Sequence, residues 1–234
     1  ALDLLIGTDP DADRAGIIVK VPVEQQAIFG KYKLLSANDA WTLLLWYRFQ
    51  REAELHGTGA AADLAKQYIT FSHVTTDALE AVGKHFGIAS RGDMLSKQGQ
   101  SVGGYLDGRR SWVGFSYIAA FADKMRQEGF TNVGGFEESN GASILGGPVA
   151  PGEVLGTGGH VNDKDGTFAA VLLAEAAAYA KSKGTSLFEM LDEIYSQIGY
   201  YATANKPLPR VGAFFGSSGK EKKIRFLQTA QDWL

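Results

Sequence analysis

Three aspartates near the start of the chain stand at alternate positions in a short polar stretch. They are Asp9, Asp11 and Asp13 in the segment Thr8-Asp9-Pro10-Asp11-Ala12-Asp13-Arg14. In an extended strand, alternate side chains lie about 6.6 Å apart, too far for three carboxylates to hold one ion. A turn that brings two carboxylates within about 4 Å creates a repulsion of roughly 4 kcal/mol. A divalent cation relieves this repulsion, and an all-oxygen ligand set favours Mg²⁺.

The same stretch has two other interpretations. A solvated acidic turn, in which Arg14 neutralises one aspartate, needs no metal. An EF-hand also begins with aspartates at this spacing, but it requires glycine at its sixth position and glutamate at its twelfth. This chain has Arg14 and Lys20 there, which excludes the EF-hand. The solvated turn and a magnesium site stay open.

A second polar segment lies between glycines later in the chain. It reads Gly135-Phe136-Glu137-Glu138-Ser139-Asn140-Gly141, and its acceptors and hydroxyl suit the hydroxyl groups of a sugar. An ordinary polar loop explains the same composition. Farther on, the segment His160-Val161-Asn162-Asp163-Lys164-Asp165-Gly166 precedes an apolar helical stretch.

In this order, the three segments resemble motifs of the α-D-phosphohexomutase superfamily, the phosphoglucomutases and phosphomannomutases. The resemblance implies Mg²⁺ as the cofactor, with Asp9, Asp11 and Asp13 as its ligands. It also implies that Arg14 supports the catalytic centre as an electrostatic partner of phosphate or carboxylate.

The later motifs imply a hexose phosphate as substrate. By resemblance, Glu137 and Ser139 contact the hexose, and Lys164 faces the sugar phosphate in a catalytic and substrate-binding role. Lys164 as a surface residue at a helix start is the alternative. In many relatives a lysine stands where this chain has Ser116, and an arginine often stands where it has Asn162. Both departures remove positive charge near a phosphorylated ligand.

Composition excludes several other classes of protein. Of the 234 residues, 45% are hydrophobic and 21% charged, as in a globular protein. The net charge of −3 predicts neither a nucleic-acid nor a membrane-surface partner. The chain lacks cysteine, which excludes disulfides and thiolate metal sites. The apolar run 168–180 contains Glu175 and is too short for a bilayer of about 30 Å. We expect a cytoplasmic protein.

Strand and helix patterns alternate along the chain, which predicts an α/β fold. The resemblance implies two α/β units with mixed sheets flanked by helices, similar to the middle domains of a phosphohexomutase. Residues 1–60 would be the C-terminal part of the metal-binding second domain, and 66–205 the sugar-binding third domain. Residues 206–234 would link them to a missing final domain.

Local signals place the elements that position these segments. Strands are expected at 2–6, 17–21 and 68–71, and helices after 38–39, over 79–86 and over 115–125. The run 168–180 is apolar nearly all round and predicts a helix buried on several sides, with Asp165 available as a cap near its start. Ser186 and Glu189 predict a capping box for a helix over 187–198. The stretch 90–110 is expected to be a long loop, and 216–223 connecting chain.

The resemblance implies a phosphoserine mechanism that interconverts hexose 1-phosphate and 6-phosphate through a bisphosphate intermediate. The expected sugar is glucose first and mannose second. The serine loop and most of the final domain would lie outside this chain, so we expect the isolated chain to be inactive. A catalytically silent module that binds sugar phosphate or metal is the alternative. An aspartate-dependent phosphatase is a third hypothesis.

Overall fold

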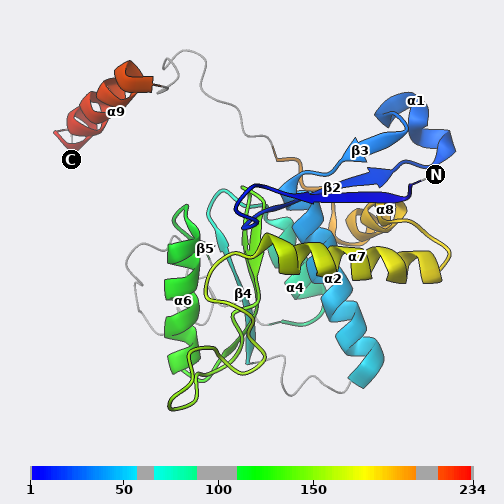
Figure 1. The fold of residues 1–234 in the computed structure, drawn as a ribbon, viewed down its shortest axis with the longest axis horizontal. Coiled ribbons are helices and arrows are strands. Elements are labelled where there is room, and N and C mark those ends of the chain that lie inside the picture. Colours follow the sequence, from blue (N-terminus) through cyan, green and yellow to red (C-terminus); the bar gives the residue numbers. More distant parts are fainter. Residues whose placement is uncertain (1, 57–65, 89–109, 204–215, 233–234) are drawn as a thin grey trace. The chain divides into compact units, whose positions relative to one another are not determined.

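The computed structural model describes residues 2–56, 66–88, 110–203 and 216–232. It divides into two compact units, Ala1–Tyr201 and Ala202–Leu234. The first unit contains both sheets and is shown with the rest of the chain in Figure 1. The predicted α/β class is confirmed.

The first sheet carries the three aspartates in a hairpin loop. Its strands are β1 (Leu4–Thr8), β2 (Ala15–Lys20) and β3 (Tyr32–Leu34), antiparallel in the order β1-β2-β3. Thr8 pairs with Ala15, so residues 9–14 form the hairpin loop, which we call the acidic loop. Two short helices, η1 (Val23–Gln25) and α1 (Gln26–Phe29), connect β2 to β3. The two predicted strands are confirmed, each displaced by about two residues.

The second sheet is mixed and has the order β5-β4-β6-β7. Its strands are β4 (Gln67–Ser72), β5 (Arg110–Ser111), β6 (Thr131–Glu137) and β7 (Gly141–Ser143). Strand β4 is parallel to β5 and to β6, whereas β6 and β7 form a hairpin in which Glu137 pairs with Gly141. We call residues 137–141 the polar loop. It lies at the edge where the three parallel strands end, which is where α/β sheets usually bind ligands.

Helices cover both faces of this sheet (Figure 1). They include α2 (Ala37–His56), α4 (Ala78–His85), α6 (Phe115–Gln127) and α7 (Gly166–Ser182). Helix α8 (Leu187–Ile198) packs on α2, α4, α7 and β2. Helix α6 packs in a small core with Tyr68 of β4, whereas Ile69 and Phe71 of the same strand join a larger core. Alternate residues of β4 therefore serve opposite layers.

The larger core surrounds α2, whose side chains Trp41 and Leu45 are fully buried. Helix α2 contacts α4, α7, α8 and β6. This core contains residues from both sides of the domain boundary expected near residue 60. The division into a second and a third domain stays a prediction.

The last two helices of the first unit begin at the expected caps. The Asp165 carboxylate accepts a hydrogen bond from Phe168 N at 2.9 Å and caps α7. Ser186 and Glu189 form the predicted capping box of α8, which is confirmed. The buried residues of α7 form one stripe, and Val171 on the other side is 60% exposed. The prediction that this helix is buried on several sides is wrong, because the small alanines facing away from the core need no partner.

Two other predictions concern the segments between and after these elements. Residues 216–223 were expected to be connecting chain, but the structure forms α9 (Gly216–Gln231), so this local prediction is wrong. Glutamate and lysines after Gly219 favour a helix more than the glycines and serines before them oppose it. The predicted loop at 90–110 lies almost entirely outside the described residues. In the described segments, no helix combines the length and apolar character needed to cross a membrane.

Candidate functional site

The acidic loop brings its three carboxylates together. Ala12 adopts a left-handed conformation with φ of 57°, and its N–H donates to Asp9 O at 3.0 Å. This tight turn replaces the extended spacing that would separate alternate side chains. One carboxylate oxygen each from Asp9, Asp11 and Asp13 lies within 4.8 Å of the others. The geometry needed for a shared ion is therefore present.

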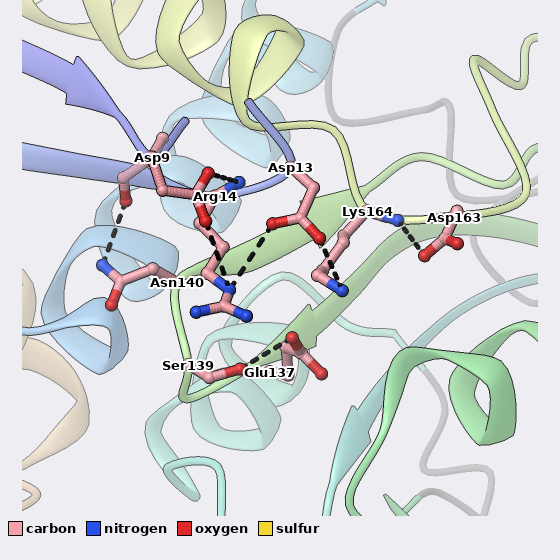
Figure 2. A network of polar contacts seen from close by, with 9 residues as sticks. Asp9, Asp13, Arg14, Glu137, Ser139, Asn140, Asp163 and Lys164 are labelled. Carbon is pink, nitrogen blue, oxygen red and sulfur yellow. Dashed lines mark hydrogen bonds and ion pairs between the residues drawn. The ribbon is translucent and has the colours of Figure 1, made fainter. Parts of the chain in front are cut away.

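Two cations lie beside these carboxylates (Figure 2). Arg14 Nε lies 3.6 Å from Asp9 Oδ2 and 3.4 Å from Asp13 Oδ1. Lys164 Nζ, which comes from the segment before α7, lies 2.8 Å from Asp13 Oδ2. Asp13 therefore stands between both cations.

Hydrogen bonds and charges shift the pKa values of two of these groups, Asp9 and Lys164. Partial burial raises the pKa of the Asp9 carboxyl, but the hydrogen bond from Arg14 N, a hydrogen bond with the Asp11 side chain and the Arg14 charge outweigh it, so the pKa lies below its ordinary value. The hydrogen bond to Asp13 raises the pKa of the Lys164 ammonium above its ordinary value, although burial opposes this. Near neutral pH Asp9 is therefore ionised and Lys164 is protonated.

The polar loop holds a buried acid at its base. Glu137 is only 4% exposed, and the Ser139 hydroxyl donates to its Oε1 at 2.7 Å. Trp41 Nε1 of α2 donates to the Glu137 backbone carbonyl at 2.9 Å. A Cβ on Gly141 would lie 2.7 Å from Glu137 Oε1 and 2.8 Å from Lys164 Cδ. Lys164 thus reaches both loops, as Figure 2 shows.

Backbone contacts join the segments that carry these side chains. Ala15 N donates to the Asn140 carbonyl at 3.1 Å, and Asn140 Nδ2 donates to Ala15 O at 3.0 Å. Gly166 N, at the start of α7, donates to Ala12 O at 3.0 Å. A Cβ on Gly166 would lie 2.2 Å from Arg14 O, so only glycine permits this approach.

The polar loop is also anchored to the turn after β4. Glu138 Oε2 accepts hydrogen bonds from Ser72 Oγ at 2.7 Å and from Thr75 Oγ1 at 3.3 Å. The next residue, Thr76, donates its N–H to Asn38 Oδ1 of α2 at 3.1 Å. Glu138 is therefore a structural acid of the loop, whereas Glu137 faces Ser139 and Lys164.

The two positions that depart from the family pattern are both exposed. Ser116 lies in the first turn of α6. Asn162 Oδ1 accepts a hydrogen bond from Arg126 Nη2 at 3.0 Å. Arg126 is itself 3% exposed and pairs with Asp123, so its charge is not available to a ligand in place of the arginine of the relatives.

The residues of the acidic loop fit a hard divalent cation. All three candidate donors are carboxylate oxygens, the type that Mg²⁺ prefers. Asp13 Oδ1 is buried and has no hydrogen-bond partner within the described residues, its nearby cation being Arg14. A buried carboxylate oxygen without a hydrogen bond is costly, and a bound ion would satisfy it.

Comparison with known proteins identifies the family of the residues that carry Glu137, Ser139 and Lys164. Residues 94–198 match the family model described as "Phosphoglucomutase/phosphomannomutase, alpha/beta/alpha domain III". These residues belong to the phosphohexomutase superfamily. The predicted resemblance is confirmed, and the helix, sheet and helix layers agree with the domain III description.

Relatives of known name are phosphomutases or a sugar bisphosphate synthase. Phosphopentomutase of Mus musculus is 26% identical over 204 residues, 86% of this chain and 26% of the relative. Glucose 1,6-bisphosphate synthase of Homo sapiens is 25% identical over 202 residues, 85% of this chain and 26% of the relative. Phosphoglucomutase of Staphylococcus saprophyticus is 25% identical over 220 residues, 94% of this chain and 31% of the relative. The chain spans about a quarter to a third of the length of these relatives.

The domain III match contains part of the predicted site. Glu137, Ser139 and Lys164 lie inside it, whereas the acidic loop lies outside it. The structure nevertheless brings both groups into one cluster.

The sequence alone predicted no role in the site for Asn140 or Trp41. The glycine that follows Asn140 was a signal for a left-handed turn, but the partner of that turn was not visible in the sequence.

Proposed function

We propose that this chain is the metal-binding and sugar-binding part of a sugar-phosphate mutase. The observation that carries the proposal is the single cluster in which Lys164 connects Asp13 of the acidic loop to the polar loop of Glu137 and Ser139. Acids for a cation, cations for a phosphate and acceptors for hydroxyls are all needed to transfer a phosphoryl group to or from a sugar.

Each group has a distinct role in this proposal. Glu137 accepts hydrogen bonds from sugar hydroxyls, and Ser139 exchanges its present hydrogen bond to Glu137 for one to the substrate. Lys164 and Arg14 stabilise the negative charge of the phosphate. Asp9, Asp11 and Asp13 would hold Mg²⁺, which when bound supplies positive charge to the transferring phosphoryl group.

The proposed reaction interconverts the 1-phosphate and 6-phosphate of a hexose, glucose first and mannose second. A phosphoserine outside these residues donates its phosphoryl group, and a bisphosphorylated sugar takes the place of the monophosphate before one phosphate returns to the serine. The partners of this chain are then the sugar phosphate and the regions of the same protein that carry the serine loop and the final phosphate-binding domain. A cytoplasmic location belongs to the same proposal.

The names of the relatives extend the set of sugars to test. They include phosphopentomutase, glucose 1,6-bisphosphate synthase, phosphoglucomutase and phosphomannomutase. Assays of the complete protein with glucose, mannose and ribose 1-phosphates, with and without Mg²⁺, separate these specificities. Conversion of one of them only in the presence of Mg²⁺ supports the proposal.

Replacement of one acid tests the metal role. Asp11 is exposed and has neither cation within its ion-pairing range in the described structure, so Asp11→Asn removes a candidate ligand while both Asp13 ion pairs remain. We expect turnover and Mg²⁺ affinity to fall at least about ten-fold. The matched control is Asp192→Asn on α8, where Asp192, among the described residues, accepts only a 3.4 Å hydrogen bond from Gln25. Full turnover by the Asp11 variant would contradict the ligand role.

A catalytically silent binding module is a second candidate, favoured by exposed Ser116 and Asn162. Neither supplies a positive charge, and buried Arg126 cannot replace one. Calorimetric titration of the complete protein distinguishes the candidates, because a silent module binds sugar phosphate without converting it. The variant Ser116→Lys with Asn162→Arg should then tighten phosphate binding without creating turnover.

A further inference from the structure

Asn140 connects the two loops of the candidate site through the backbone of one residue. Its carbonyl accepts from Ala15 N at 3.1 Å, and its side-chain amide donates to Ala15 O at 3.0 Å. Both polar backbone groups of Ala15 are thereby bound to Asn140. Ala15 is 1% exposed, so these groups have almost no access to water.

The position of Asn140 in the chain means that this contact links the polar loop to the acidic loop. It follows Ser139 directly in the polar loop, and Ala15 follows Arg14 directly at the end of the acidic loop. Movement of one loop must therefore either move the other or break two hydrogen bonds to the buried residue Ala15. Figure 2 shows Asn140 between the two groups of side chains.

The backbone conformation explains why asparagine suits this place. Asn140 has φ of 70°, a left-handed conformation that asparagine and glycine adopt more easily than other residues. Glycine would supply the conformation without the amide. Aspartate would keep the shape of the side chain but turn a carboxylate oxygen toward the Ala15 carbonyl. Only asparagine provides both the turn and the donor.

We infer that Asn140 is a positioning residue that couples occupancy of the acidic loop to occupancy of the polar loop. The inference rests on the proposed function, because it takes Mg²⁺ and a sugar phosphate as the two ligands. Since such coupling is reciprocal, Mg²⁺ tightens sugar-phosphate binding by the same factor as the sugar phosphate tightens Mg²⁺ binding. Among the described residues, Asn140 hydrogen-bonds to Ala15 and to no candidate ligand side chain, so it acts through the position of the acidic loop.

The test measures this coupling by calorimetry on the 234-residue chain. Mg²⁺ and glucose 1-phosphate are each titrated alone and then in the presence of the other. The variants are Asn140→Asp, and Asn140→Gly in case the first does not fold. The matched control is Gln26→Glu, because Gln26 Nε2 also donates to a backbone carbonyl, that of Val21, at 2.8 Å in a remote helix.

We expect each ligand to tighten binding of the other about five-fold or more in the wild-type chain and in Gln26→Glu. In both Asn140 variants the factor should fall to below two-fold, and hydrogen exchange of the Ala15 amide should be faster. An unchanged coupling factor in the Asn140 variants, or ligands that bind the wild type without coupling, would overturn the inference alone. Failure of the wild-type chain to bind either ligand in the separate titrations would instead count against the proposed function as well.

Discussion

At the scale of single residues, the cluster of the acidic and polar loops depends on two close contacts made at glycine residues. Lys164 spans both loops because Gly141 leaves room for its stem beside Glu137. Gly166 lets the start of α7 touch the backbone of the acidic loop. The side chains that do the proposed chemistry thus depend on neighbours that lack a side chain.

Replacement of Gly166 by alanine tests the second contact. The added Cβ would lie 2.2 Å from Arg14 O and 2.4 Å from Arg14 C, so α7 and the acidic loop must separate. Alanine favours a helix by about 1 kcal/mol over glycine, but overpacking against backbone outweighs this. We expect the free energy of unfolding in urea to fall by about 1–3 kcal/mol and Mg²⁺ affinity to decrease.

The control for this variant is Gly7→Ala in β1. A Cβ at Gly7 meets nothing within 4 Å, and Gly7 has no positive φ. The free energy of unfolding of the Gly7→Ala variant should change by no more than about 1 kcal/mol, because the substitution mainly lowers the conformational entropy of the unfolded chain. Equal losses of stability in the two variants would show that the close approach at Gly166 is not the cause.

Most of the candidate site residues could be predicted from residue types and their spacing in the sequence. Asp9, Asp13, Glu137 and Lys164 were each proposed from their motifs, and the structure places them in one cluster. The contact of Asn140 with Ala15 could not be predicted, because it joins positions 125 residues apart. No local pattern reports which backbone a distant amide will meet.

At the scale of elements, α7 connects the site to the core. Its N-cap residue Asp165 follows Lys164 directly, and its buried stripe packs in the larger core. The His160 imidazole lies 2.8 Å from Asp165 Oδ2 and stacks on Phe168, with ring centroids 4.0 Å apart. The cap therefore fixes the direction in which the chain before α7, and Lys164 with it, approaches the acidic loop.

The charge of this cap predicts a dependence of stability on pH. Burial raises the pKa of the Asp165 carboxyl, but hydrogen bonds with Phe168 N and His160 lower it to a net value below the ordinary one. Because the unfolded value is about 3.9, the ionised cap stabilises the fold above about pH 4, and this contribution is lost as the pH falls through the folded value.

The variant Asp165→Asn isolates this contribution. Asparagine can still cap the helix, but it cannot ionise, so we expect it to be about 1 kcal/mol less stable than wild type at pH 7. The difference in the free energy of unfolding should shrink between pH 5 and pH 3. A difference that stays constant over this range would mean that the carboxylate charge plays no part in the cap.

Local signals explain which elements could be predicted. The capping box at Ser186 and the cap at Asp165 depend on residues within one turn, and both predictions are confirmed. Burial of α7 depends on distant elements. Its apolar outer face predicted burial on several sides, whereas Val171 on that face is exposed. Helix α9 was missed because glycine and serine at its start resemble a loop.

At the scale of the whole molecule, three segments far apart in sequence meet at one place. The acidic loop, the polar loop and the segment before α7 are joined by hydrogen bonds within the first unit. The alternation of strands and helices predicted an α/β fold but could not predict this meeting, which depends on how the sheets pack around α2. The matched domain III and the acidic loop outside it thus contribute to one cluster of polar side chains.

The isolated chain offers the last prediction. If the phosphoryl donor lies outside these residues, the 234-residue chain holds the groups that we propose bind a cation and a sugar phosphate but no group that supplies the phosphoryl. We expect it to bind Mg²⁺ in calorimetry and to convert no detectable hexose 1-phosphate into 6-phosphate in a coupled assay. Conversion that Asp11→Asn abolishes would locate the donor within this chain, and Ser139, whose hydroxyl already lies in the cluster, would then be the first serine to replace by alanine.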